Sequence, residues 1–260
     1  MASAPCPSDT SALLALAERL ARDAARVVMA VRSCGAAVET KADATPVTEA
    51  DRAAERLILA GLRAATPEIP VVAEEAVAEG RDPGPASRFW LVDPLDGTRE
   101  FAAGRPEFAV NIGLVEAGRP VVGAVALPAF GEVFGGIVGV GAWKEDASGR
   151  RPIAARRVPA AGPVVFASRH HGDDQRIVAF AEAHRAARVV HAGSALKFCR
   201  VAEGLADLYP RFGATMEWDT AAPQAIVEAA GGSVTTAGGA PLRYGKPGWR
   251  NPDFLCRGRE

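Results

Sequence analysis

Acidic residues stand at the ends of apolar, strand-like stretches of the sequence. Glu74, Asp93 and Asp96 each follow such a stretch, where a carboxylate is costly unless another group offsets its charge. Asp219 opens a helical stretch further along the chain. Clustered carboxylates, with the backbone carbonyl of Leu95 between two of them, are hard oxygen ligands that favour Mg²⁺ over zinc. The pattern therefore predicts a magnesium site.

Gly97 and Thr98 come directly after these aspartates and offer unhindered backbone amides at a predicted helix start. Amides in such a turn bind phosphate oxygens well. We therefore interpret the segment 93–98 as a metal–phosphate site, in which the acids hold the ion and the amides hold a phosphoryl group.

Each of these residues also has a purely structural interpretation. Asp51 lies three residues after Thr48, which is the spacing of a capping box. Asp219 could be a helix N-cap, Glu74 an exposed turn residue, and the segment 93–97 a turn built from turn-forming residues. The joint pattern, rather than any single position, supports the metal site.

Helices and strands alternate along the chain and must position these residues. The first part begins with an amphipathic helix over 13–31 and a second helix over 48–65. We expect five strands to follow, at 69–73, 89–92, 108–115, 121–127 and 132–138.

The stretch 144–162 is polar and rich in Arg, Gly and Pro, which marks a candidate boundary between two lobes, 1–147 and 148–260. Strands and helices alternate beyond it, as in an α/β layer. The predicted elements are strands 164–167 and 189–191, helices 175–186 and 195–203, and a last helix that follows Asp219 and ends at Gly231-Gly232.

Composition excludes several classes of protein. The 260 residues include 30 basic and 31 acidic side chains, for a net charge of −1, and 48% are apolar. This balance excludes a disordered chain and disfavours a dedicated nucleic-acid binder, which would be strongly basic.

Targeting signals and cysteine spacing point to the cytoplasm. The first ten residues carry no Lys or Arg, unlike a secretory signal peptide, and the charges within 13–31 argue against a transmembrane segment. The scattered cysteines are expected to be free thiols of a reducing compartment: Cys6, Cys34, Cys199 and Cys256. Peripheral association with the inner membrane stays open, as does the choice between monomer and homodimer.

The joint pattern of motifs resembles the inositol monophosphatase superfamily of Mg²⁺-dependent, Li⁺-sensitive phosphatases. The matching pieces occur in the family's order and span nearly the whole chain: Val47–Asp51, Glu74-Glu75, Asp93–Thr98, Trp218–Ala222 and Glu228–Gly232. Within the superfamily the sequence is most similar to the bacterial CysQ type of 3'(2'),5'-bisphosphate nucleotidase. That likeness rests on Glu100-Phe101, Ser168–His171, Gly193–Cys199, Tyr209–Gly213 and Glu217–Asp219. Two departures are Ala195, where a Ser is common, and Pro223, where the family often has Gly.

The resemblance implies an α+β or α/β chain with a layered α-β-α-β-α sugar-phosphatase fold and an active site between the lobes. By analogy, two or three Mg²⁺ ions would bind to Glu74, Asp93, Asp96, Asp219 and the carbonyl of Leu95. The implied catalytic residues are Asp51, Thr98 and Glu74, with Asp51 orienting the Thr98 hydroxyl toward the attacking water. The amides of Gly97 and Thr98 would hold the scissile phosphate. On the nucleotide side the candidates are His171, Gly193, Ser194, Lys197, Arg211 and Glu217.

The implied activity is hydrolysis of adenosine 3',5'-bisphosphate to AMP and phosphate, which would recycle a by-product of sulfate assimilation. The runner-up is an inositol-1-phosphate or fructose-1,6-bisphosphate phosphatase with the same metal site. Glu100 and the stretch 193–199 favour the nucleotidase. A phosphatase-like protein that serves mainly as a protein or RNA partner is disfavoured, because every expected metal ligand is present and no basic run marks an RNA-binding face.

Overall fold

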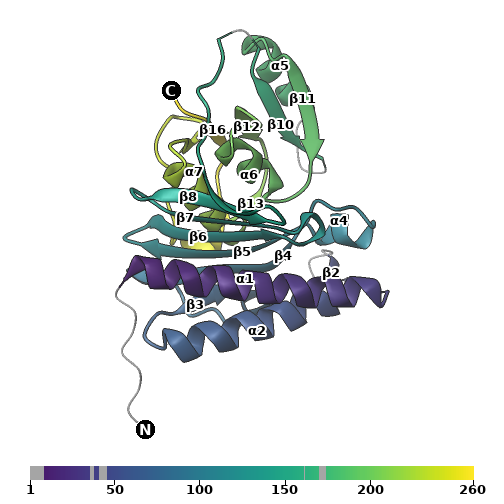
Figure 1. Ribbon diagram of the computed structural model, residues 1–260, viewed down its shortest axis with the longest axis vertical. Helices are drawn as coiled ribbons and strands as arrows, with labels where there is room; N and C mark the ends of the chain where they lie inside the picture. Colours follow the sequence, from purple (N-terminus) through teal and green to yellow (C-terminus); the bar gives the residue numbers. More distant parts are fainter. Residues whose placement is uncertain (1–8, 36–37, 41–45, 161, 170–173) are drawn as a thin grey trace.

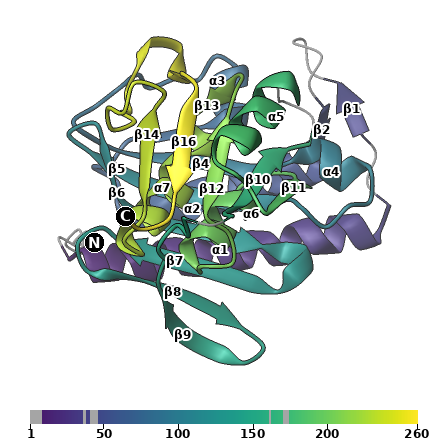
Figure 2. The same cartoon turned by 90° about the horizontal axis from the view of Figure 1, so that it is seen from above.

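Two mixed β-sheets and three groups of helices make up the structure (Figures 1 and 2). The computed structural model describes residues 9–35, 38–40, 46–160, 162–169 and 174–260. Helices α1 and α2 lie on one side of a seven-stranded sheet, α6 and α7 lie between this sheet and a five-stranded one, and α5 lies at the end of the molecule remote from α1 and α2. The layered architecture expected from the sequence is confirmed.

The seven-stranded sheet has its strands in the order of the sequence, from β3 to β9. Strand β3 runs parallel to β4, and every other neighbouring pair is antiparallel. The strands are β3 (Val71–Ala73), β4 (Arg88–Asp96), β5 (Ala109–Glu116), β6 (Arg119–Leu127), β7 (Glu132–Ile137), β8 (Gly141–Asp146) and β9 (Gly149–Ile153).

Helices α1 (Thr10–Ser33) and α2 (Glu49–Ala65) cover one face of this sheet. Helix α1 begins where the side chain of Asp9 accepts a hydrogen bond from the amide of Ser11. Its apolar residues recur at helical spacing and are buried, so the amphipathic helix predicted over 13–31 is confirmed. Helix α2 ends before Pro67, also as predicted.

Helix α7 (Ala221–Ala229) packs directly on the other face of the sheet, against a row of glycines. Gly113, Gly123 and Gly136 are neighbours across β5, β6 and β7. A Cβ atom added to Gly123 would come within 2.1 Å of the carbonyl oxygen of Ala222, and one on Gly113 within 2.7 Å of the Ala222 amide nitrogen. The absence of side chains in this row is what lets α7, and with it the preceding Asp219, approach the sheet so closely.

The five-stranded sheet has the order β11-β10-β12-β16-β14, in which β10 is parallel to β11 and β12 and the other pairs are antiparallel. Its strands are β10 (Val164–Ser168), β11 (Arg188–Ala192), β12 (Leu208–Arg211), β14 (Ser233–Thr236) and β16 (Phe254–Arg257). Helix α5 (Asp174–Ala183) connects β10 to β11, and α6 (Leu196–Ala202) packs on β12 and β16.

Short elements complete the described structure. Two pairs of strands stand apart from the main sheets, β1 (Val38–Thr40) with β2 (Pro46–Thr48) and β13 (Thr215–Met216) with β15 (Arg250–Asn251). The short helices are α3 (Glu74–Ala78), α4 (Thr98–Ala102), η1 (Pro128–Phe130), η2 (Glu217–Asp219) and η3 (Pro247–Trp249).

The predicted boundary between residues 147 and 148 falls inside the β8–β9 hairpin, and both strands belong to the seven-stranded sheet. Among the strands of the described residues, the chain passes from one main sheet to the other only between β9 and β10. The stretch 144–162 has the polar, Arg-, Gly- and Pro-rich composition of a candidate boundary because β9 is exposed and lacks the apolar alternation that marks a half-buried strand.

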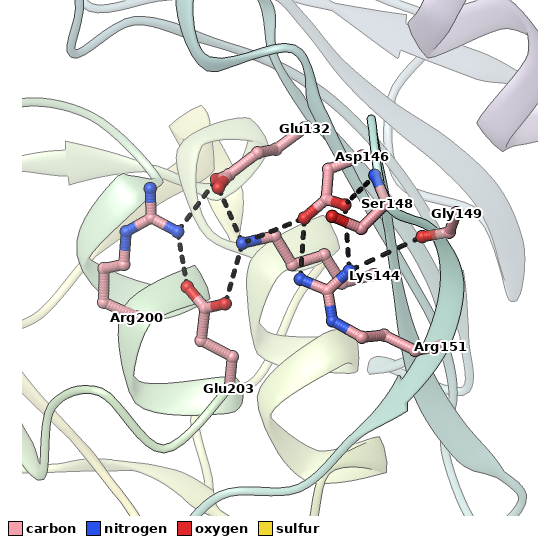
Figure 3. A network of polar contacts seen from close by, with 8 residues as sticks. All are labelled: Glu132, Lys144, Asp146, Ser148, Gly149, Arg151, Arg200 and Glu203. Carbon is pink, nitrogen blue, oxygen red and sulfur yellow. Dashed lines mark hydrogen bonds and ion pairs between the residues drawn. The ribbon is translucent and has the colours of Figure 1, made fainter.

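A closed ring of four charged side chains joins the two halves of the molecule (Figure 3). Lys144 Nζ lies 2.6 Å from Glu132 and 2.9 Å from Glu203, and Arg200 pairs with the same two carboxylates. Glu132 and Lys144 come from β7 and β8, whereas Arg200 lies on α6 and Glu203 directly follows it. The ring therefore fixes α6 to the seven-stranded sheet.

The expectations about transmembrane segments and free cysteines can be compared with the described residues. None of the helices there is long and apolar enough to cross a bilayer. Three of the four cysteines are free, Cys34 at the surface and Cys199 and Cys256 in the interior. Cys6 lies outside the described residues.

Candidate active site

A cavity of about 510 Å³ opens where β4, α4, the start of α6 and the turn before α7 meet. It is lined by most of the residues singled out in the sequence: Glu74, Asp93, Leu95, Asp96, Gly97, Thr98, Gly193, Ser194, Lys197, Arg211 and Asp219. The structure thus brings together segments that are far apart in the chain.

Asp93 and Asp96 face the same cavity because β4 is irregular between them. Asp93 pairs with Asn111 and Asp96 with Ala109, so β4 contains one more residue than β5 over this interval. Residues three apart in a regular strand point to opposite faces, and an inserted residue of a β-bulge reorients the side chains that follow it. The bulge contains Pro94, which has no amide hydrogen to donate to the sheet.

Gly97 makes the turn from β4 into α4 possible. Its φ of 90° lies in the left-handed region, and a Cβ atom there would meet the carbonyl oxygen of Glu107 at 2.9 Å. The next residue, Thr98, begins α4, so both residues whose amides the sequence predicted for phosphate binding line the cavity.

Asp51 lies behind Thr98 and is 2% exposed. Its Oδ1 is 3.1 Å from Thr98 Oγ1, which is also 3.0 Å from the carbonyl oxygen of Leu95. Its Oδ2 accepts hydrogen bonds from the amide and the hydroxyl of Thr48, at 2.7 and 2.6 Å. The predicted capping box is therefore present, and the same carboxylate also contacts Thr98. Burial raises the pKa of Asp51, against the effect of the hydrogen bonds from Thr48.

Asp219 is held by the turn that precedes α7. Its Oδ2 accepts a hydrogen bond from the amide of Met216 at 2.8 Å. Helix α7 has Thr220 as its N-cap. The alternative interpretation of Asp219 as the N-cap of this helix is therefore not what the structure contains.

The three aspartates of the cavity each use one oxygen in hydrogen bonds from backbone amides. The donors are Leu95 for Asp93 at 3.0 Å, Ala195 for Asp96 at 2.6 Å, and Met216 for Asp219. Within the described part of the chain, the second oxygen of each has no hydrogen-bond partner, and no three acidic, His or Cys side chains already surround one point.

The electrostatics of this cluster fit a divalent cation. Burial, followed by repulsion from Glu74 and the neighbouring aspartates, raises the pKa of Asp93 well above its usual value. Burial raises the pKa of Asp219 to about 8 and that of Asp96 to about 6, with Lys197 and the Ala195 amide opposing the rise at Asp96. Carboxylates that are buried together with too little positive charge are stabilised by a hard cation, so the residues present suit Mg²⁺.

Lys197 projects from the start of α6 and is 2% exposed. Its Nζ donates to the carbonyl oxygens of Ala192 and Ser194, at 3.1 and 2.7 Å. Burial lowers its pKa to about 7, while the nearby Asp96 favours the charged form. Lys197 thus stabilises the turn whose Ala195 amide binds Asp96.

Arg211 lies at the end of β12 and also lines the cavity. Its Nη1 donates to Ser168 Oγ at 2.7 Å and its Nη2 to the carbonyl oxygen of Ala214 at 2.7 Å. Among the described residues, its buried Nε has no hydrogen-bond partner. Ser168 begins the motif 168–171 but was not among the predicted site residues; its hydroxyl accepts the hydrogen bond that orients Arg211.

Two predicted substrate residues need separate comment. Glu217 is fully buried outside the cavity lining, and its carboxylate accepts hydrogen bonds from the amides of Gly245 and Lys246, at 2.7 and 2.9 Å. In this structure Glu217 therefore holds the 245–246 turn and does not line the cavity, unlike the other predicted substrate residues in the described part of the chain. His171 lies outside the described residues.

The layered fold and this acidic cavity suit a phosphatase, and comparison with known proteins identifies the family. A sequence profile described as the inositol monophosphatase family matches residues 9–253. The chain belongs to the inositol monophosphatase family, as the motifs predicted.

Within this family, the chain is similar to named relatives and to solved structures over most of its length. The chain is 44% identical over 239 residues to "3'(2'),5'-bisphosphate nucleotidase CysQ" of Salmonella typhimurium. The matched region covers 91% of this chain and 96% of the relative. The protein of the same name from Escherichia coli K12 is 41% identical with the same coverage. The crystal structure of CysQ from Bacteroides thetaiotaomicron superposes with a TM-score of 0.79 at 33% identity, covering 96% of this chain and 98% of that one. An inositol monophosphatase from Zymomonas mobilis gives 0.80 at 28% identity, covering 97% and 95%.

Proposed function

We propose that this protein is a Mg²⁺-dependent 3'(2'),5'-bisphosphate nucleotidase that removes the 3'-phosphate of adenosine 3',5'-bisphosphate to give AMP and phosphate. The observation that carries the proposal is the composition of one cavity, which is lined by several carboxylates, by the turn Gly97-Thr98 and by two buried cations, Lys197 and Arg211. The names of the relatives support the choice of substrate.

We assign two or three Mg²⁺ ions to Glu74, Asp93, Asp96, Asp219 and the carbonyl of Leu95. The free oxygens of the three aspartates and their raised pKa values support this assignment. Bound there, Mg²⁺ would offset the negative charge of the phosphoryl group and make a water more acidic.

Thr98 and Asp51 act on the attacking water in this proposal. The Thr98 hydroxyl donates a hydrogen bond to Asp51, so its oxygen is free to accept one from the water. As the water attacks, its proton would pass to Thr98 Oγ1 while the Thr98 proton passes to Asp51. Burial raises the pKa of Asp51, which makes its carboxylate a better proton acceptor than an exposed one. The hydrogen bonds from Thr48 keep that carboxylate in place.

The amides of Gly97 and Thr98 hold the scissile phosphate, as expected for turn amides at a helix start. We assign Arg211 to the phosphate that is not cleaved, because this residue lines the same cavity and its guanidinium is a fork-shaped donor that suits a phosphate. Gly193, Ser194 and Lys197 also line the cavity and would contact the nucleotide.

We also place the protein in the cytoplasm. The thiols of Cys34, Cys199 and Cys256 are free, as in a reducing cytoplasm. A small nucleotide would be the partner, rather than a nucleic acid, and the enzyme would be a monomer or homodimer.

Phosphate release from a panel of substrates tests this function. We expect a large preference for adenosine 3',5'-bisphosphate over inositol-1-phosphate and fructose-1,6-bisphosphate in the presence of Mg²⁺, and its loss in Asp96→Asn. A preference for inositol-1-phosphate would keep the metal site but overturn the nucleotide assignment. No release from any of the three would reject the proposed function.

A further inference from the structure

The first turn of α3, which carries Glu74, has no cap of its own. Its N-cap residue is Ala73, in extended conformation with φ −129° and ψ 144°, and no side chain there accepts a hydrogen bond. The first amides of a helix have no acceptor within the helix and need one from elsewhere. In a buried segment such as this one, leaving them without an acceptor would be costly.

Glu55 of α2 provides the acceptor. Its Oε2 accepts a hydrogen bond from the amide of Glu75 at 2.8 Å, and the carboxylate also interacts with the amide of Ala76. The residue is 3% exposed and does not line the cavity, so it is placed to act on α3 and not on a ligand directly. A negative charge at the start of a helix is favourable for the same reason that an N-cap is.

Asp51 and Glu55 lie one turn apart and therefore on the same face of α2. Asp51 contacts Thr98 in the first turn of α4, while Glu55 contacts the first turn of α3. One helix thus sets the positions of two separate segments, one with Glu74 and one with Thr98.

We propose that Glu55 is a positioning residue of the metal site, which caps α3 in place of Ala73 and so holds Glu74 where it binds the ion. The inference rests on the proposed function, because Glu74 is assigned as a ligand there. Groups that orient metal ligands without touching the metal contribute about 10- to 100-fold to metal affinity.

A titration of thermal unfolding with MgCl₂, on the full chain without substrate, tests this inference. We expect Glu55→Gln to raise the Mg²⁺ concentration for half-maximal stabilisation about tenfold, because an amide side chain is a weaker acceptor for the α3 amides. Glu18→Gln is the matched control: Glu18 is also buried, but its carboxylate pairs with Arg150 and is not among the cavity residues. That variant should leave the Mg²⁺ midpoint unchanged.

A rescue variant separates capping from loss of charge. Ala73 has the extended backbone of an N-cap, so Ala73→Ser places a local acceptor near the same amides. The double variant Glu55→Gln with Ala73→Ser should recover most of the wild-type Mg²⁺ affinity. If Glu55→Gln does not fold, the Mg²⁺ affinity of the double variant becomes the test. A double variant that also does not fold would overturn the inference.

The outcomes are distinguishable. An unchanged midpoint in Glu55→Gln, or a weakened one that Ala73→Ser does not rescue, would overturn the role of Glu55 while leaving the proposed function intact. No stabilisation of the wild-type protein by Mg²⁺ would overturn both.

Discussion

At the residue scale, the pair Thr98 and Asp51 carries the proton chemistry of the account. We expect Thr98→Ala to lower kcat by about 100-fold or more, because general acid–base help is typically of that size or larger. Thr98→Ser keeps the hydroxyl and should retain most of the activity. Steady-state kinetics at saturating Mg²⁺ measures both, and equal losses in the two variants would contradict a role for the hydroxyl.

The buried aspartates predict how stability depends on pH. The usual pKa of an aspartate is 3.8, whereas burial raises the pKa of Asp96 to about 6 and that of Asp219 to about 8. The folded state then holds these protons more tightly than the unfolded chain does. The Tm of the metal-free protein should therefore decrease as the pH is raised from about 5 to about 7. Lys197, with its pKa lowered to about 7, acts in the opposite direction only above that pH.

Mg²⁺ competes with the same protons. The rise in Tm that a fixed Mg²⁺ concentration produces should therefore grow over this pH interval. Thermal unfolding with and without the ion measures the effect, and a metal-free Tm that increases from pH 5 to 7 would show that these carboxyls do not have raised pKa values.

At the scale of elements, α7 depends on the glycine row beneath it. Gly123→Ala places a methyl group about where the Ala222 carbonyl oxygen lies, and such overpacking costs about 1–3 kcal/mol. The shift of α7 should also move Asp219 and weaken Mg²⁺ binding. Gly238→Ala is the control, since a Cβ atom there meets nothing closer than 3.9 Å. Equal stability of the two variants by urea unfolding would contradict this account.

The ring of charges in Figure 3 makes a second prediction at this scale. Lys144→Met leaves Glu132 and Glu203 with Arg200 as the remaining cation of the ring, in a largely buried setting, and should lower the free energy of unfolding by about 3 kcal/mol. Arg151→Met removes a more exposed cation beside Asp146 and should change stability little. Denaturant unfolding compares the two, and a Lys144 variant as stable as the wild type would rule out the ring as a lock on α6.

Sequence reasoning succeeded where the signal is local. Asp93 and Asp96 lie three residues apart, with a proline between them. In a regular strand this spacing would place their side chains on opposite faces, but the motif itself encodes the bulge that brings them together. It failed where the signal is distant or weak: Glu55 acts on an amide 20 residues away, and β12 has only four residues including Pro210. Propensity gives no indication of either.

At the scale of the whole molecule, the two sheets share one hydrophobic core. Phe89 and Val125 of the large sheet belong to the same cluster of buried side chains as Tyr209 and Phe254 of the small sheet. We therefore expect one cooperative unfolding transition, in which tryptophan fluorescence and circular dichroism change together. Two separated transitions would show that the sheets are independent units.

The central claim is that water attacks the 3'-phosphorus of a nucleotide bisphosphate directly in this cavity. The most direct measurement is turnover of adenosine 3',5'-bisphosphate with Mg²⁺ in water enriched in a heavy oxygen isotope, followed by mass analysis of both products. The account predicts label in the released phosphate and none in the nucleotide, which should be the 5'-monophosphate. Label in the nucleotide, or the 3'-monophosphate as product, would contradict it.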